Sequence, residues 1–210
     1  GYSGFTYRHI AEPLGIRNAA VHYHFPSKTD LGVALIERYR DVLRKGTSEF
    51  MRHGGDPLVQ IEGYFLFCRH EYSECDRICP IGIMAGDYYN LPEKMRETGR
   101  LLVEETLAWL TKVLELGREE GIFGFEGKPA AKALMLQAAL QGAAEIGRIT
   151  GNRGLYEDAI AQARTDLGLP QQTADSTVED ATKLLRQSGS KNLQDAAQAQ
   201  ARRDASPLES

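Results

Sequence analysis

The sequence predicts an all-α protein, with an N-terminal helix-turn-helix domain followed by a helical bundle. Three observations support this fold class. Apolar residues recur at helical spacing through most of the chain up to about residue 167. Glycine and proline fall between these periodic stretches, where helices begin and end. No segment alternates apolar and polar residues for long enough to predict a β-strand.

The first 31 residues predict two short helices joined by a tight turn. Thr6 can cap the first helix, and Gly15 can supply the positive φ that a turn between crossed helices needs. The second helix is expected over residues 17–23, before Pro26. Pro13 lies inside the first helix, where proline costs about 3 kcal/mol. We therefore expect that helix to kink or to end early.

The remaining elements follow from caps and periodicity. Ser27 should cap a connecting helix, and Asp56 followed by Pro57 is a typical helix start. The segment Cys79-Pro80-Ile81-Gly82 is expected to break the helix before it. The expected helices after the turn are 27–52, 57–78, 83–89, 91–120, 129–150 and 155–167.

Composition divides the chain into three segments. We expect a helix-turn-helix domain with its connecting helix over 1–45, and a helical ligand-binding and dimerisation domain over 46–170. Residues 171–210 lack aromatic residues and are rich in Ala, Gln, Ser and Asp, so this polar tail is expected to be disordered or weakly helical.

The second short helix carries side chains suited to reading DNA. In a helix-turn-helix, this helix enters the major groove. Arg can form two hydrogen bonds with the edge of a guanine, and Asn can form two with the edge of an adenine. Ala can contact a thymine methyl group. The candidate recognition residues are Arg17, Asn18, Ala19, His22 and Tyr23. The alternative for the aromatic residues here is that they pack at the junction between helices.

The same segment resembles the DNA-binding domain of the tetracycline-repressor (TetR) family. The resemblance rests on Phe5-Thr6, Ile10-Ala11, Gly15-Ile16 and the run Tyr23-His24-Phe25-Pro26-Ser27-Lys28-Thr29-Asp30-Leu31. It implies a ligand-responsive, dimeric transcriptional regulator that binds double-stranded DNA. It also implies phosphate contacts by Thr6, Tyr7, Tyr23, His24 and Lys28. The family has one more helix before the position of Gly1. The alternative is a helical hairpin with an accidental basic face.

A ligand pocket is expected in the helical body, because bundles hold small molecules between helices in mostly apolar cavities. The resemblance to the family supports this pocket, although aromatic and Met residues at helical spacing also form ordinary core. The effector itself is unknown. The candidate lining residues are Tyr64, Phe65, Cys68, Met84, Tyr88, Tyr89, Leu102, Thr106 and Trp109.

The three cysteines, Cys68, Cys75 and Cys79, do not resemble a secreted disulfide framework. Cys68 shares a stripe with Ile61 and Phe65, so burial should raise its thiol pKa and suppress its reactivity. Inert cysteine is the preferred interpretation, with redox or electrophile sensing as the alternative. The spacing matches no standard zinc pattern, so no metal or other cofactor is expected.

Small residues in the 129–150 helix suggest close helix packing. The family resemblance implies that this helix and the 155–167 helix pair with their copies in a homodimer. The alternative is tight packing within one subunit. The small residues are Ala138, Ala139, Gly142, Ala143 and Gly147.

Charge is distributed unevenly along the chain. Residues 1–53 carry a net charge of +3, whereas the other 157 carry −7, for a total of −4. A basic N-terminal part on an acidic body suits a protein that touches phosphates at one end. There is no apolar run of 18 residues and no visible secretory signal, so we expect a cytoplasmic protein without a membrane segment.

The sequence therefore predicts a ligand-responsive, DNA-binding transcriptional regulator, a repressor that a small molecule releases from its operator. No nucleophile with an adjacent base and no phosphate loop is visible, so we expect no enzyme activity. Two alternatives remain. One is a helical small-molecule-binding dimer that cannot bind DNA in this form, and the other is a cysteine-based redox or electrophile sensor.

Overall fold

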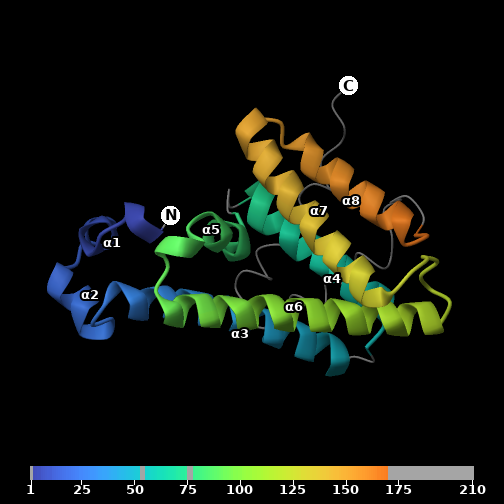
Figure 1. Cartoon of the computed structure of the whole chain (residues 1–210), viewed down its shortest axis with the longest axis horizontal. Coiled ribbons are helices and arrows are strands. Elements are labelled where there is room, and N and C mark those ends of the chain that lie inside the picture. Colours follow the sequence, from blue (N-terminus) through green and yellow to red (C-terminus); the bar gives the residue numbers. More distant parts are fainter. Residues whose placement is uncertain (1, 53–54, 75–77, 170–210) are drawn as a thin grey trace. The chain divides into compact units, whose positions relative to one another are not determined.

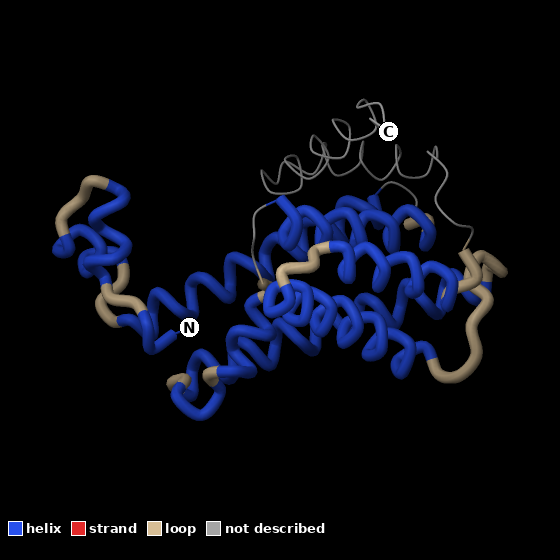
Figure 2. Tube along the Cα trace, turned by 90° about the horizontal axis from the view of Figure 1, so that it is seen from above, coloured by secondary structure: helices blue, strands red, loops and turns tan. Residues whose placement is uncertain are grey.

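The computed structural model describes residues 2–52, 55–74 and 78–169, and these residues form helices and connecting loops without a strand (Figure 2). The all-α prediction is confirmed for them. The helices are α1 (Tyr7–Leu14), α2 (Asn18–His24), α3 (Lys28–Arg52), α4 (Pro57–Arg69), α5 (Pro80–Gly86), α6 (Glu93–Glu119), α7 (Pro129–Thr150) and α8 (Gly154–Asp166) (Figure 1). The predicted tail over 171–210 lies outside the described residues.

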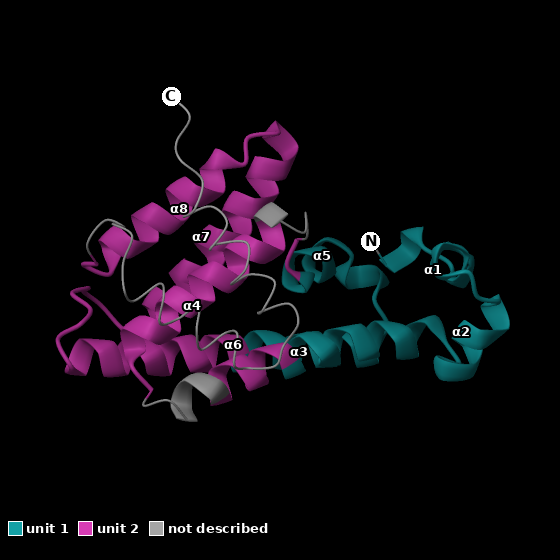
Figure 3. Cartoon of the chain, turned by 180° about the vertical axis from the view of Figure 1, so that it is seen from behind, with its two compact units in different colours: residues 1–41, 80–105 teal, residues 42–79, 106–210 magenta. Residues whose placement is uncertain are grey.

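The described chain divides into two compact units (Figure 3). Unit 1 comprises Gly1–Asp41 and Pro80–Glu105, and unit 2 comprises Val42–Cys79 and Thr106–Ser210. The long helices α3 and α6 therefore each contribute residues to both units. The predicted boundary between residues 45 and 46 remains a prediction, and unit 1 also contains a segment from the middle of the chain.

The turn between α1 and α2 forms at the residues that the sequence indicated. Gly15 has φ of 63°, and its N–H donates to the carbonyl of Glu12. The N–H of Ile16 donates to the carbonyl of Ala11, which is the 6→1 bond that ends many helices before a left-handed glycine. α1 runs through Pro13 and ends one residue later, so the proline occupies the last turn. Of the two expectations, a kink or an early end, the early end is not observed, because the helix does not end before Pro13, and the kink remains a prediction.

The first core cluster of unit 1 is small. It consists of Tyr7, Ala11, Val21 and Leu31, with Phe5, Ile10 and Phe25 packed against it. Ile16 and Ala20 are both exposed, although each lies beside a buried residue or turn of this small domain. Leu14 is also 64% exposed. The cluster does not extend to these three side chains.

The second cluster of unit 1 joins the start of α6 to α3 and α5. Its buried members are Ile36, Leu91, Met95 and Leu102. Glycine permits the close packing here: a Cβ on Gly32 would lie 2.5 Å from the sulfur of Met95, and one on Gly99 would lie 2.8 Å from the sulfur of Met84. Arg40 also joins this part of α3 to α6, through a two-bond contact with the carboxylate of Glu105 at 2.6 and 3.0 Å.

Unit 2 has the main hydrophobic core, to which α4, the second half of α6, α7 and α8 contribute. Ile61, Leu110, Leu114 and Leu167 are fully buried. α7 and α8 pack against each other (Figure 1). Asp56 caps α4 by accepting a bond of 2.8 Å from the N–H of Leu58, as the Asp-Pro start predicted.

Two features of the middle of the chain differ from the prediction. α4 is followed directly by a π-helical turn, His70–Glu74, which helical periodicity alone does not reveal. Pro80 begins α5 instead of only breaking the preceding helix, because proline is well tolerated at the first helical position. The predicted 83–89 helix is therefore observed as α5 followed by a 3₁₀ turn over Tyr88–Asn90.

Candidate functional site

The helix α2 presents a polar face to solvent. The side chains of Arg17, Asn18, Ala19, His22, Tyr23 and His24 are exposed, whereas Val21 is 5% exposed and anchors the helix. Tyr23 is 82% exposed and lies edge-on to the ring of His24, with centroids 5.2 Å apart. This face can donate and accept hydrogen bonds without rearrangement of the core. Its residue types match those that read base edges in the major groove.

Tyr7 connects the two helices. Its hydroxyl is therefore not free for the phosphate contact that the family resemblance implied. Its side chain is 8% exposed, and its hydroxyl donates a bond of 2.7 Å to the carbonyl of Phe25. Burial raises the pKa of this phenol. His22 lies against the Tyr7 ring, with centroids 4.4 Å apart. Tyr7 therefore orients α2 from below, and the structure gives it no free hydroxyl for a phosphate.

Lys28, at the start of α3, also contacts its own domain. Its ammonium donates a bond of 2.6 Å to the carbonyl of Phe5 and lies 4.3 Å from the centroid of the Phe5 ring. The ring of Tyr2 lies 4.8 Å away. An ammonium has three donors, so one intramolecular bond leaves capacity for a phosphate. Thr6, the N-cap of α1, is exposed beside this contact.

Ser27 caps α3 in the predicted manner. Its hydroxyl accepts a bond of 3.2 Å from the N–H of Asp30, and it donates one of 2.7 Å to the carboxylate of the same residue. The bond from the Ser27 hydroxyl lowers the pKa of Asp30. This cap fixes the point where the chain leaves α2, so it positions the candidate recognition helix relative to α3.

The nine residues predicted to line a ligand pocket fall into both units. Tyr64, Phe65, Cys68, Thr106 and Trp109 belong to unit 2, and Met84, Tyr88, Tyr89 and Leu102 belong to unit 1. Phe65 and Leu102 are core residues, and Tyr89 is 93% exposed. In unit 2 the ring of Tyr64 lies 5.6 Å from that of Trp109, and the Tyr64 hydroxyl donates to Gln137 at 2.5 Å.

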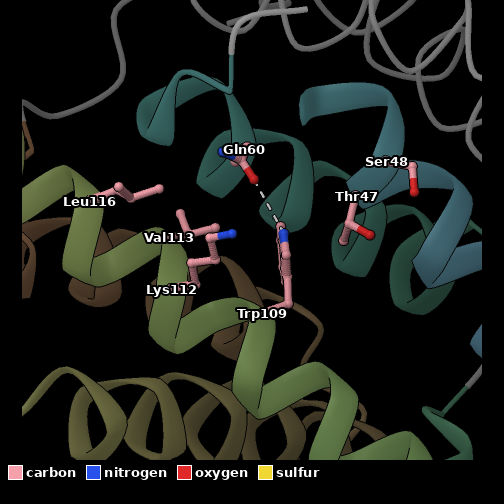
Figure 4. A pocket seen from close by; sticks show the side chains of 7 residues that line it. All are labelled: Thr47, Ser48, Gln60, Trp109, Lys112, Val113 and Leu116. Atoms are coloured by element: carbon pink, nitrogen blue, oxygen red, sulfur yellow. Dashed lines mark hydrogen bonds between the residues drawn. The ribbon is translucent and has the colours of Figure 1, made fainter. Parts of the chain in front are cut away.

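Unit 2 contains a pocket of about 280 Å³ that Trp109 helps to line (Figure 4). Of the residues predicted to bind a ligand, only Trp109 lines it. The sequence held a signal for the rest of this wall, because Trp109, Lys112, Val113 and Leu116 recur at intervals of 3, 1 and 3 on one face of α6. The described residues that line it are Thr47, Ser48, Gln60, Trp109, Lys112, Val113 and Leu116.

The thiol of Cys68 has a raised pKa, as the sequence predicted. Burial, together with the nearby thiol of Cys79, raises the pKa of its thiol to about 12. Burial also raises the pKa of the neighbouring phenols of Tyr64 and Tyr156. Cys75 lies outside the described residues. Within the residues that the structure describes, no group of three or more His, Cys, Asp or Glu side chains could hold a metal.

α7 is apolar on two opposite faces. Its inner face, with Leu136, Leu140 and Gly147 among its members, is buried in the core of unit 2. A Cβ on Gly147 would lie 2.4 Å from the hydroxyl of Tyr72, so this glycine serves packing within the subunit. We define the outer face of α7 as Met135, Ala138, Ala139, Gly142, Ile146 and Ile149. Met135, Ile146 and Ile149 are 64%, 55% and 85% exposed.

Comparison with known proteins agrees with this architecture. Residues 1–35 match the family model described as bacterial regulatory proteins, tetR family. A TetR-family transcriptional regulator from Agrobacterium tumefaciens has a solved structure that is 30% identical in sequence, with a TM-score of 0.72, over 82% of this chain and 90% of that chain. The chain belongs to the TetR family.

Other relatives extend the TetR-family match along the chain. The HTH-type transcriptional repressor NemR of Escherichia coli K12 is 24% identical over 173 residues, which cover 81% of this chain and 87% of NemR. The crystal structure of the reduced form of NemR has the same fold, with a TM-score of 0.68 at 24% identity over 81% of this chain and 90% of that chain. The protein is therefore a DNA-binding transcriptional regulator, with a helix-turn-helix at its N-terminal end.

In the part of the chain that the structure describes, no helix is both long enough and apolar enough to cross a bilayer.

Proposed function

We propose that this TetR-family regulator is a homodimeric repressor that a small molecule releases from its operator. The observation that carries the proposal is the exposed polar face of α2, held by Val21 and Tyr7 on a helix-turn-helix. In this proposal Arg17 and Asn18 read base edges, and Thr6, Tyr23, His24 and Lys28 contact phosphates. Double-stranded DNA is the macromolecular target, and no catalytic step is part of the function.

The outer face of α7 supports the homodimer. Three large apolar side chains on one helix face are 55% or more exposed, and Gly142 between them has nothing within 4 Å of the position of a Cβ. Exposed apolar surface of this kind is costly on a monomer and is buried by association. A two-fold axis places the same face on both partners. α7 and α8 would then form a four-helix bundle with their copies.

The proposed response to an effector begins with a small molecule that binds in the helical body. A ligand that binds one arrangement of the dimer better than another shifts the spacing of the two α2 helices, and DNA and ligand then oppose each other. Typical coupling changes affinity by about 5- to 150-fold. The proposed ligand residues of unit 2 are Tyr64, Phe65, Cys68, Thr106 and Trp109, together with Met84, Tyr88, Tyr89 and Leu102 of unit 1.

The experiment is to select duplexes from a random pool with the full-length protein, and then to screen small molecules for release of a selected duplex. Fluorescence anisotropy of the labelled duplex measures the affinity with and without each molecule. A molecule that weakens binding by at least about 5-fold supports the proposal. The proposed response would be contradicted if a duplex is selected but no molecule of a broad collection releases it.

A thiol sensor is the second candidate, favoured by one observation. Cys79 is close enough to Cys68 for the two thiols to affect each other's ionisation. Because the pKa of Cys68 is about 12, a thiol response would have to begin at Cys79. We expect mild peroxide or quinone treatment to leave DNA binding unchanged. A reversible loss of binding that the Cys79→Ser variant abolishes would replace the effector proposal with thiol sensing.

A further inference from the structure

The Trp109 side of the pocket is a prearranged flat wall. The indole N–H of Trp109 donates to the side-chain oxygen of Gln60 at 3.2 Å. The amide group of Gln60 in turn donates to the carbonyl of Gly55 at 2.6 Å, and Gln60 is 1% exposed. Figure 4 shows the indole standing between Gln60 and Thr47. The ring is therefore held in place before any ligand arrives, which lowers the entropy cost of binding against it.

The remaining walls differ in polarity. Val113 and Leu116 add apolar surface next to the indole. Thr47 and Ser48, from α3, bring two hydroxyl groups to the opposite side (Figure 4). The Thr47 hydroxyl donates to the carbonyl of Arg44 at 3.1 Å, which leaves its oxygen able to accept or its proton to reorient.

Lys112 gives the pocket a positive charge. Among the lining residues that the structure describes, Lys112 is the charged one, and none of them is Asp or Glu. None of the ion pairs found among the described residues involves Lys112. An ammonium at the rim of an apolar pocket favours an anion, because the apolar wall limits screening by water on one side.

We propose that this pocket binds a small aromatic carboxylate. The volume of about 280 Å³ lies just below the usual range of pockets for drug-sized ligands and suits a smaller molecule, a single ring with short substituents. The ring would stack on the Trp109 indole in an offset arrangement, with the carboxylate toward Lys112. The hydroxyls of Thr47 and Ser48 can meet a second polar group of the ligand. The inference concerns binding alone and stands whether or not the occupant acts on DNA.

The chain contains a single tryptophan, so its intrinsic fluorescence reports on this pocket. The experiment titrates the full-length protein at low ionic strength with benzoate, and separately with benzamide, which has the same shape without the charge. Lys112→Gln removes the positive charge at an exposed position, and Lys112→Arg retains it. Lys128→Gln is the matched control, because Lys128 is exposed on the same unit but does not line the pocket. Circular dichroism checks that each variant keeps its helices.

We expect saturable quenching of Trp109 by benzoate, with an affinity about 5-fold higher than that for benzamide. The preference should disappear in Lys112→Gln and persist in Lys112→Arg and Lys128→Gln. Equal affinity for the two compounds in the unmodified protein would overturn the proposal. So would quenching that never saturates, or a benzoate preference that survives in Lys112→Gln.

Discussion

At the scale of single residues, Tyr7 and Lys28 differ in what their internal bonds leave for DNA: the Tyr7 phenol has donated its single proton, whereas the Lys28 ammonium keeps two donors. Both occupy positions that the family resemblance assigned to phosphates. In the structure the Tyr7 hydroxyl donates a hydrogen bond to the Phe25 carbonyl, and the Lys28 ammonium donates one to the Phe5 carbonyl. These bonds join segments 18 and 23 residues apart, so sequence spacing could not predict them. The side chains of Arg17 and Asn18 make no such contact with the residues that the structure describes, and they remain the proposed base readers.

The first prediction separates base reading from phosphate contact. Arg17→Ala should relax the preference for one base, with a loss of about 1–3 kcal/mol on the selected duplex and little loss on random duplexes. Lys28→Ala should weaken binding to all sequences alike and reduce the slope of log affinity against log salt by about one. Anisotropy titrations at several salt concentrations measure both effects. If Arg17→Ala weakens random and selected duplexes equally, Arg17 is a phosphate contact.

The second prediction concerns the Cys68 thiol. Its pKa rises from the ordinary 9.0 to about 12 in the folded protein, so the folded state keeps its proton to higher pH than the unfolded state. This contribution to stability is complete below pH 9 and is lost as pH rises toward 12. Urea unfolding should therefore show a midpoint that falls from pH 8.5 to pH 11, with a smaller fall in Cys68→Ala.

Tyr23→Phe is the control for this pH dependence, because the Tyr23 ring is 82% exposed. It should follow the unmodified protein across the pH range. A midpoint that stays constant, or an unchanged slope in Cys68→Ala, would show that the Cys68 thiol is solvated in the folded state.

At the scale of elements, capping residues predicted where helices begin and end. The sequence did not predict the irregular segments between them. Thr6, Gly15, Ser27 and Asp56 stand at the helix ends that the sequence indicated, because each makes or permits a local backbone bond. The π-helical turn after α4 depends instead on packing: Tyr72 in that turn contacts the Tyr156 ring at 4.7 Å. That partner lies in α8, so no local pattern could reveal it.

α7 shows the same limit in another form. Its small residues predicted close packing, yet the sequence could not divide them between two partners. The structure places Gly147 against Tyr72 inside the subunit, whereas Gly142 faces open space. The periodicity of α7 also did not reveal that its apolar residues form two opposite faces.

The third prediction tests the inner face of α7. Gly147→Ala would bring a methyl carbon to 2.4 Å from the Tyr72 hydroxyl and 2.9 Å from the backbone oxygen of Asn152. Because the backbone oxygen cannot swing aside like a flexible side chain, we expect a loss of about 1–3 kcal/mol in unfolding free energy. Gly86→Ala, with nothing within 4 Å of its new methyl group, is the control and should lose far less. Equal urea midpoints for both variants would contradict the close contact.

The fourth prediction tests the outer face of α7. Ile149 is 85% exposed in the protomer, so Ile149→Glu should leave the fold intact but place a charge in the proposed dimer interface. Light scattering at micromolar concentration should give a dimer for the unmodified protein and a monomer for the variant. Leu35→Glu makes the same change at an exposed apolar residue of unit 1 and should remain dimeric. A monomeric unmodified protein, or a dimeric Ile149→Glu variant, would rule out this interface.

At the scale of the whole molecule, the fold class and the DNA-binding element followed from the sequence, and the effector site did not. The recognition element is a contiguous segment whose turn, caps and exposed face are encoded locally. The pocket beside Trp109 draws residues from α3, α4 and α6, so its lining depends on how distant segments pack. The nine predicted ligand residues remain a proposal, divided between unit 1 and unit 2.

The uneven charge belongs to this scale as well. With +3 on residues 1–53 and −7 on the rest, phosphates are attracted to one end and repelled by the other. Non-specific binding to DNA should therefore be weak, and specific contacts by α2 must supply most of the discrimination.

The most direct test of the account is the affinity of the full-length protein for a duplex selected from a random pool, compared with unselected duplexes of the same length at physiological salt. We predict a dissociation constant of about 10⁻⁸ to 10⁻¹¹ M for the selected duplex, at least about 10³-fold tighter than for the unselected ones. Equal affinity for selected and unselected duplexes would contradict the account, and would favour a helical small-molecule-binding dimer that does not bind DNA in this form.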